Sequence, residues 1–104
     1  MIEQNAPRNW YAAEVIAELP RNRWPQSWFF IGNRVYIRRE VKPQATGVFY
    51  IAFDGNPRHG AWTLSTPDCQ RCLRAIRTAD GKPALLPVVT RRWLDNEYRA
   101  SLYQ

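Results

Sequence analysis

Two runs of aromatic and β-branched residues around Gly32-Asn33 constrain the fold of this chain most strongly. They are 28–31 (Trp-Phe-Phe-Ile) and 34–38 (Arg-Val-Tyr-Ile-Arg), and residues of these types favour strands. Glycine at the first central position of a two-residue loop is typical of a type II′ turn, so the pattern predicts a β-hairpin. Such a turn also fixes the register, with Phe30 opposite Val35.

Side chains alternate between the two faces of a strand, so this hairpin would have an apolar face and a mixed face. The predicted core face consists of Trp28, Phe30, Val35 and Ile37. The other face combines aromatic with cationic side chains. Together with an aromatic residue of the next strand it forms a predicted binding platform, which consists of Phe29, Arg34, Tyr36, Arg38 and Tyr50.

Two further strands are predicted after the hairpin. The first covers 47–53, where alternation places Phe49, Ile51 and Phe53 on one face. A turn cluster at 54–57 separates it from a short strand. That strand covers 61–64. Successive strands joined by short turns favour antiparallel pairing.

Three helices are predicted around this sheet. The first runs from 10 to 19, where apolar residues recur at i, i+3, i+4 and i+7. The second begins at Thr66-Pro67, a capping hydroxyl followed by proline, and continues to Asp80-Gly81. The third runs from 91 to about 102. An apolar stretch interrupted by proline, 85–89, is expected to be an edge strand or an extended segment.

The expected fold class is α+β. Residues 1–104 would form a small single domain, mainly an antiparallel sheet of about four strands with three helices packed on it, and 1–8 would be loosely ordered. A chain of 104 residues can bury a core without disulfides or metals. The first residues lack the apolar core of a signal peptide, and no run approaches the ~18 apolar residues of a membrane helix. A cytoplasmic protein with reduced thiols and no membrane partner is therefore expected.

Arginine dominates the charge of the chain. The formal net charge is +6, and of the 15 basic residues only Lys42 and Lys82 are lysine. Arginine grips phosphate or carboxylate with a planar fork of donors, and it stacks on aromatic rings. A field of this sign favours anionic partners. A GC-rich genome would also enrich arginine without any functional demand, and this alternative stays open.

These features predict a small non-enzymatic binding protein whose partner is a nucleic acid, DNA or RNA. Bases would stack on the exposed aromatic rings while arginine neutralises phosphate. A helix could instead cover the platform, in which case the binding surface moves to a helical stripe of Arg71, Arg74 and Arg77. The alternative is an inhibitor or adaptor of a phage or mobile element, of the anti-CRISPR kind, that docks on an acidic surface of a host protein complex. Arginine and aromatic residues dominate protein interfaces as well.

Cys69 and Cys72 are the most obvious candidates for a chemical site. They form a single pair, so a zinc site would also need His59 and a carboxylate such as Asp54 or Asp68, or a water. A redox pair at a helix start is another interpretation. Their helical spacing places both thiols on the apolar face, where free cysteine packs as a small hydrophobe. Structural packing is therefore the favoured interpretation, and no metal and no cofactor is expected.

No residue is assigned a catalytic role. His59 lies in a glycine-containing turn, where Asp54 is a candidate partner for acid–base chemistry. Glu14 and Glu18 form an i, i+4 pair of the kind usually found on a solvated helix face. The sequence contains no glycine-rich phosphate loop and no nucleophile elbow. An enzyme is therefore the third hypothesis, behind the two kinds of binding protein.

Overall fold

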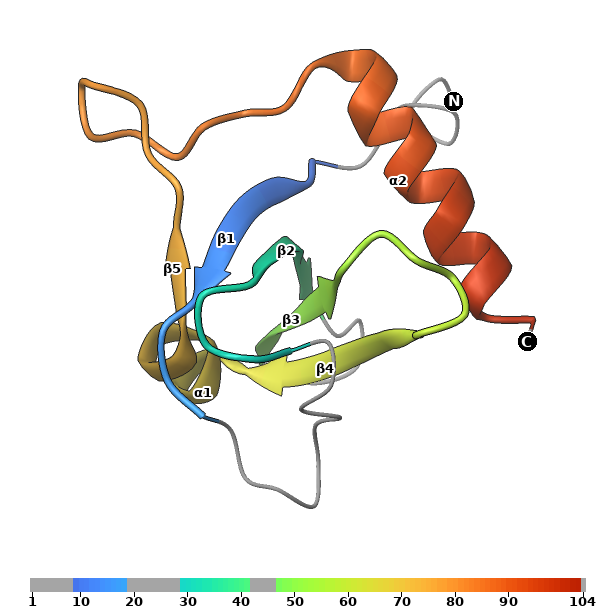
Figure 1. The fold of residues 1–104 in the computed structure, drawn as a ribbon, viewed down its shortest axis with the longest axis horizontal. Coiled ribbons are helices and arrows are strands. Elements are labelled where there is room, and N and C mark those ends of the chain that lie inside the picture. The colour runs from blue at the N-terminus through green and yellow to red at the C-terminus, as the bar shows by residue number, and fades with distance from the viewer. Residues whose placement is uncertain (1–8, 19–28, 42–46, 104) are drawn as a thin grey trace.

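The computed structural model describes residues 9–18, 29–41 and 47–103, and there the chain is an α+β domain built on one antiparallel sheet (Figure 1). The strands are β1 (Tyr11–Val15), β2 (Arg34–Val41), β3 (Val48–Phe53), β4 (Ala61–Ser65) and β5 (Leu73–Ala75). The helices of the described residues are α1 (Thr66–Cys72) and α2 (Val88–Ser101). The α+β class and the antiparallel sheet are confirmed, with five strands and two helices in place of about four and three.

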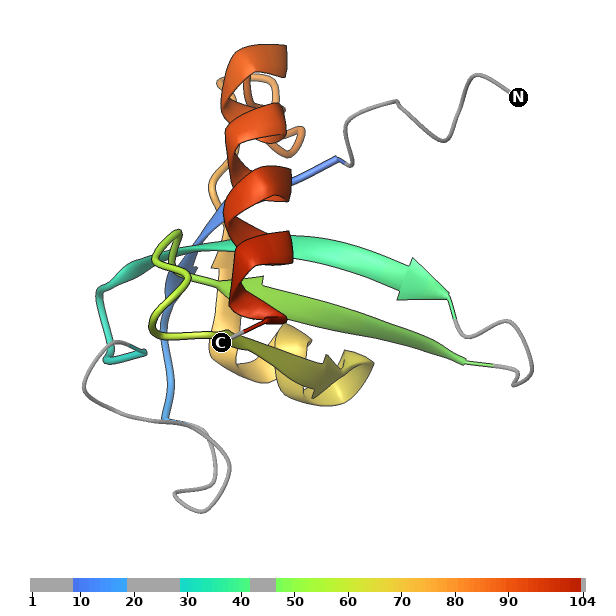
Figure 2. The same ribbon diagram turned by 90° about the vertical axis from the view of Figure 1, so that its right-hand side faces the viewer.

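The sheet has the order β4-β3-β2-β1-β5. Strands β1 to β4 follow one another as a meander, and β5 returns to pair with the free side of β1. Helix α1 and α2 lie on opposite faces of this sheet, as Figure 1 shows. Figure 2 shows α2 crossing β2 and β3 at a steep angle.

Two cores result from this layering. The α1-side core contains alternate residues of the strands together with both cysteines, and the α2-side core is largely aromatic. In β3 the predicted alternation is confirmed, since Ile51 and Phe53 belong to the α2-side core while Ala52 belongs to the α1-side core. Trp62 and Leu64 of β4 share the α1-side core, as the period of two predicts.

The predicted helix over 10–19 is wrong where the structure describes it, because Tyr11–Val15 is a strand. β1 lies between β2 and β5, and residues on both of its faces, such as Ala12 and Ala13, are buried. A strand covered on both faces shows no apolar–polar alternation, so its sequence resembled one face of a helix.

The predicted hairpin before β2 is also wrong. Phe29–Ile31 forms no strand, and the turn is shifted by one residue: the amide of Asn33 donates to the Phe30 carbonyl at 3.0 Å. Gly32 then occupies the third position of the turn with a φ of +94°, which suits a type II turn. Further predicted features lie outside the described residues. These are 1–8, the loop at 21–26, Trp28 and the turn at 42–46.

The two helices have other bounds than those predicted. α1 starts where expected, but its cap is Ser65, whose hydroxyl accepts from the amide of Asp68 at 3.3 Å. It ends at Cys72 because the following three residues pair with β1. α2 begins at Val88, directly after the proline that was expected to mark an extended segment.

Candidate nucleic-acid interface

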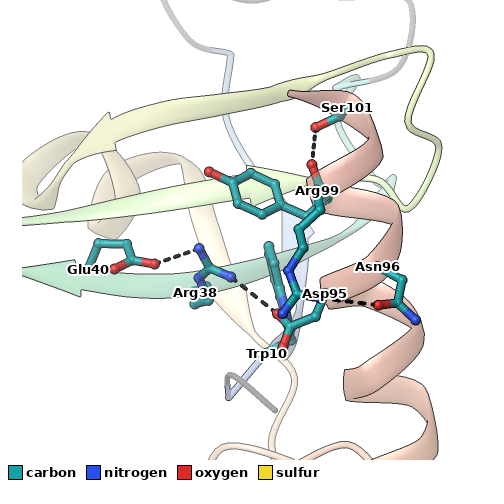
Figure 3. Close-up of polar contacts among 8 residues, drawn as sticks. Trp10, Arg38, Glu40, Asp95, Asn96, Arg99 and Ser101 are labelled. Atoms are coloured by element: carbon teal, nitrogen blue, oxygen red, sulfur yellow. Dashed lines mark hydrogen bonds and ion pairs between the residues drawn. The ribbon is translucent and has the colours of Figure 1, made fainter. Parts of the chain in front are cut away.

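The predicted platform is covered by α2, and its central arginine is buried. The Arg38 side chain is 9% exposed and forms ion pairs with Glu40 at 2.6 Å and with Asp95 of α2 at 3.2 Å (Figure 3). Its guanidinium carbon lies 4.8 Å from the ring centroid of Trp10 and 4.6 Å from that of Tyr98. The indole of Trp10 also donates to Asp95, at 2.9 Å.

These contacts give Arg38 a structural role. Its positive charge is compensated by two carboxylates and by the faces of two rings, so it connects β2 to α2. The structure therefore does not leave Arg38 open to a partner, and the prediction of an exposed platform is corrected.

The other platform residues do not share one exposed face. Phe29 is 4% exposed and packs in the α1-side core, where Tyr50 is also placed. Tyr36 lies on the opposite face, against the α2-side core. Of the five platform residues only Arg34, the first residue of β2, is exposed.

The second predicted surface is not a helical stripe. Arg71 is in the last turn of α1, where it pairs with Asp68 at 3.0 Å. Arg74 lies in β5, and Arg77 forms an isolated bridge with Pro83. These three arginines are exposed but belong to three kinds of local structure, so the prediction of a common helix face is wrong.

Two arginines predicted as separate candidates are instead brought together by the sheet. Glu14 of β1 pairs with Arg34 of β2 on one side and with Arg74 of β5 on the other. Directly paired residues in an antiparallel sheet project to the same face, with Cβ atoms about 5 Å apart. The Arg74 guanidinium reaches the Glu14 carboxylate at 2.7 Å, and these side chains are 67% and 39% exposed.

An exposed tryptophan lies on the same face of the sheet, near Tyr36. Arg34 lies two residues before Tyr36 in β2, so both side chains project to the same face of the sheet. A Cβ at Gly55 would lie 3.4 Å from the ring of Trp93 and 3.6 Å from that of Tyr36. Trp93, on α2, is 48% exposed. Figure 2 shows the start of β2 and the turn after β3 at the same end of the sheet. We call Arg34, Glu14, Arg74 and Trp93 the Arg34 patch.

Neither Glu14 nor Trp93 was singled out for binding from the sequence. Glu14 was placed on a helix, which hid its cross-strand neighbours. Trp93 lies off the stripe of Leu94 and Tyr98, and an aromatic residue outside the buried stripe of an amphipathic helix is the signal that could have found it.

Most acidic side chains of the described chain are already used by the protein itself. The carboxylates that accept hydrogen bonds or ion pairs within the protein are Glu14, Glu40, Asp54, Asp68, Asp80 and Asp95. The arginine and lysine residues of the described ranges that form no ion pair with the described residues are Arg34, Arg39, Arg58, Arg77, Lys82, Arg91, Arg92 and Arg99. The surface field is therefore set by arginine and lysine.

His59 and Asp54 meet as the sequence suggested. The Nδ1 atom of His59 lies 2.5 Å from Asp54 Oδ2, and its Nε2 atom lies 3.4 Å from the side-chain Nδ2 atom of Asn56. The backbone amide of Asn56 donates to Asp54 Oδ1 at 3.0 Å. The pair thus shapes the turn between β3 and β4, which carries Gly55.

Both cysteines are free and buried in α1. Burial raises the pKa of the Cys69 thiol from 9.0 to about 11, and the neighbouring Cys72 adds to the rise. Burial also raises the pKa of Cys72, against the lowering effect of Arg71. Such thiols stay protonated at neutral pH, which disfavours them as nucleophiles. Among residues 9–18, 29–41 and 47–103, no three His, Cys, Asp or Glu side chains gather where they could hold a metal ion.

No protein-family profile, no curated protein sequence and no solved structure matches this chain. Within the described ranges, neither helix is long and apolar enough to cross a membrane.

Proposed function

We propose that this protein binds nucleic acid, DNA or RNA, through the Arg34 patch, and that it is a binding protein without catalytic activity. The observation that carries the proposal is that Arg34 and Arg74 are exposed and project to one face of the sheet, the face on which the exposed ring of Trp93 lies near Tyr36. Arginine forms strong charge-assisted hydrogen bonds with phosphate, and an exposed indole offers a surface for a base.

The rest of the surface supports the same partner. The acidic side chains are largely engaged within the protein, so they compete little with phosphate elsewhere on the surface. A cationic surface increases the rate of encounter with a polyanion and gives binding that weakens steeply with salt. Trp93 can stack only on an unpaired base, so a single strand should bind more tightly than a duplex.

Fluorescence anisotropy with labelled oligothymidylate and oligouridylate of about 20 nucleotides tests the proposal. Affinity should fall by at least about tenfold between about 50 and 200 mM salt. Arg34→Ala should reduce the slope of log affinity against log salt by about 0.7, the value for one contact to a single strand. Salt-independent binding, or no binding at low salt, would contradict the proposal.

Trp93→Ala separates stacking from charge. It should weaken binding to a single strand by about 1–3 kcal/mol and leave the salt slope unchanged. Tyr103→Ala is the matched control, because Tyr103 is an aromatic residue that is 88% exposed but lies outside the Arg34 patch. Equal effects of the two substitutions would show that no stacking site exists at Trp93.

A second candidate function, docking on an acidic host protein, is favoured by apolar side chains at the same end of the sheet as Arg34. Ile16, Phe30 and Ile31 are 40%, 52% and 55% exposed. The backbone places them there, because the amide of Gly32 donates to the Val15 carbonyl at 2.8 Å. A protein partner would need them, whereas a nucleic acid would not. The double substitution Phe30→Ser with Ile31→Ser should therefore leave oligonucleotide binding intact and abolish only a protein complex.

A further inference from the structure

We propose that Glu14 occupies a phosphate-binding subsite formed by Arg34 and Arg74, and that a phosphate of the bound nucleic acid displaces it. This inference rests on the proposed function and specifies where the first phosphate binds. The Glu14 carboxylate, 2.7 Å from the Arg74 guanidinium, stands in the free protein where an anionic oxygen of the ligand would stand.

The sheet register places this carboxylate between two cations. Arg34 and Arg74 both pair with Glu14, from opposite sides, so their backbones lie two strand spacings apart, about 9.5 Å. Both arginine side chains are long and flexible enough to converge on the face above Glu14. The row holds one carboxylate and two arginines, of which Arg74 forms the ion pair, so the row keeps an excess of positive charge.

Displacement of Glu14 from Arg74 costs little free energy, because the ion pair is on the surface. With side chains 67% and 39% exposed, Arg74 and Glu14 interact through solvent of high dielectric constant. A phosphate offers more acceptor oxygens than the carboxylate and can accept two parallel hydrogen bonds from one guanidinium. Glu14 would then compete with the phosphate for Arg74 and lower the affinity for nucleic acid. Its removal should therefore strengthen binding.

The variant Glu14→Gln tests this in the same anisotropy assay. It should tighten binding of the oligothymidylate probe by about fivefold, since an exposed ion pair is worth up to about that factor. Asp68→Asn is the matched control. It removes one negative charge and frees an exposed arginine, Arg71, on the other side of the sheet. Long-range charge is screened by salt, so this control should change the affinity by less than about twofold.

The double variant Glu14→Gln with Arg74→Ala shows whether the gain depends on the proposed contact. The gain of Glu14→Gln should disappear when Arg74 is absent, and melting curves followed by circular dichroism should show that every variant is folded. Equal gains in Glu14→Gln and Asp68→Asn would overturn the subsite while leaving nucleic-acid binding in place. Absence of binding in the wild type and in all variants would overturn the proposed function as well.

Discussion

Asp95→Ala removes the carboxylate through which α2 holds the buried arginine of the sheet. The change leaves Arg38 with one carboxylate partner, Glu40, and leaves the indole donor of Trp10 without its acceptor. Breaking a buried ion pair by removing one partner costs about 3–5 kcal/mol, because an uncompensated charge remains. The side chains of Arg38 and Asp95 are 9% and 7% exposed, but Glu40 still compensates part of the Arg38 charge, so we expect a loss near the lower end of this range, about 3 kcal/mol.

A loss of this size is a large part of the total stability, which is about 5–15 kcal/mol for a domain. We therefore expect the melting temperature to fall by more than about 12 °C. Urea unfolding followed by tryptophan fluorescence and by circular dichroism gives the free energy of unfolding. Asp95→Asn keeps an oxygen acceptor for Trp10 and should lose only about 1–2 kcal/mol.

Two controls complete the experiment. Glu14→Gln removes an exposed ion pair and should cost less than about 1 kcal/mol. Replacing both buried partners, Arg38→Leu with Asp95→Leu, should recover part of the loss because no buried guanidinium then remains. If Asp95→Ala costs no more than Glu14→Gln, the buried cluster does not hold α2 on the sheet, and the reasoning is refuted.

Gly32→Ala should destabilise the fold by about 1 kcal/mol in thermal melts, because of its φ of +94° alone: a Cβ there meets no atom within 4 Å. Gly47 is the control, since it is equally open but has no positive φ, and Gly47→Ala should not destabilise the fold. The free energy of unfolding should fall as pH rises from 9 to 11, because the Cys69 thiol ionises in the unfolded chain before it does in the fold. The loss should be about 1–2 kcal/mol after allowance for solvent screening, and it should be smaller in urea unfolding of Cys69→Ala, where only Cys72 still contributes. His59→Ala should change oligonucleotide affinity by less than about twofold and leave the biological effect largely intact. Complete loss of the biological activity in a folded His59→Ala protein would favour an enzyme instead.

The sequence predicted β3, β4 and the start of α1 because their signals are local. The alternation of side chains along 48–53 indicates which residues share a face of the sheet. Proline after a capping position indicates where a helix starts. The same reasoning failed where tertiary pairing decided the structure. Residues 73–75 continue a helical period, yet they pair with β1, whose backbone would otherwise lack partners on that side.

The candidate site could be predicted only in part for the same reason. Arg34 and Arg74 were both named as binding residues, but on separate surfaces, because the pairing of β1 with β2 and β5 was not visible in the sequence. The burial of Arg38 depends on Asp95, 57 residues away along the chain. Charged residues are mostly exposed, so a charged residue among aromatic residues of a strand is predicted to lie on an exposed surface. The prediction changes only when a counter-charge distant in sequence is known.

The position of β5 has a consequence for the kinetics of folding. Strands β2 to β4 and α1 follow one another between residues 34 and 72, so their contacts close short loops. The pairing of β5 with β1 joins residues such as Val15 and Leu73, and contacts so far apart in sequence cost more chain entropy to form. We therefore expect β2, β3, β4 and α1 to be formed in the transition state for folding. The β1–β5 pairing and the docking of α2 would follow. Substitutions at Leu64 should then mainly slow folding, whereas Asp95→Ala should mainly speed unfolding.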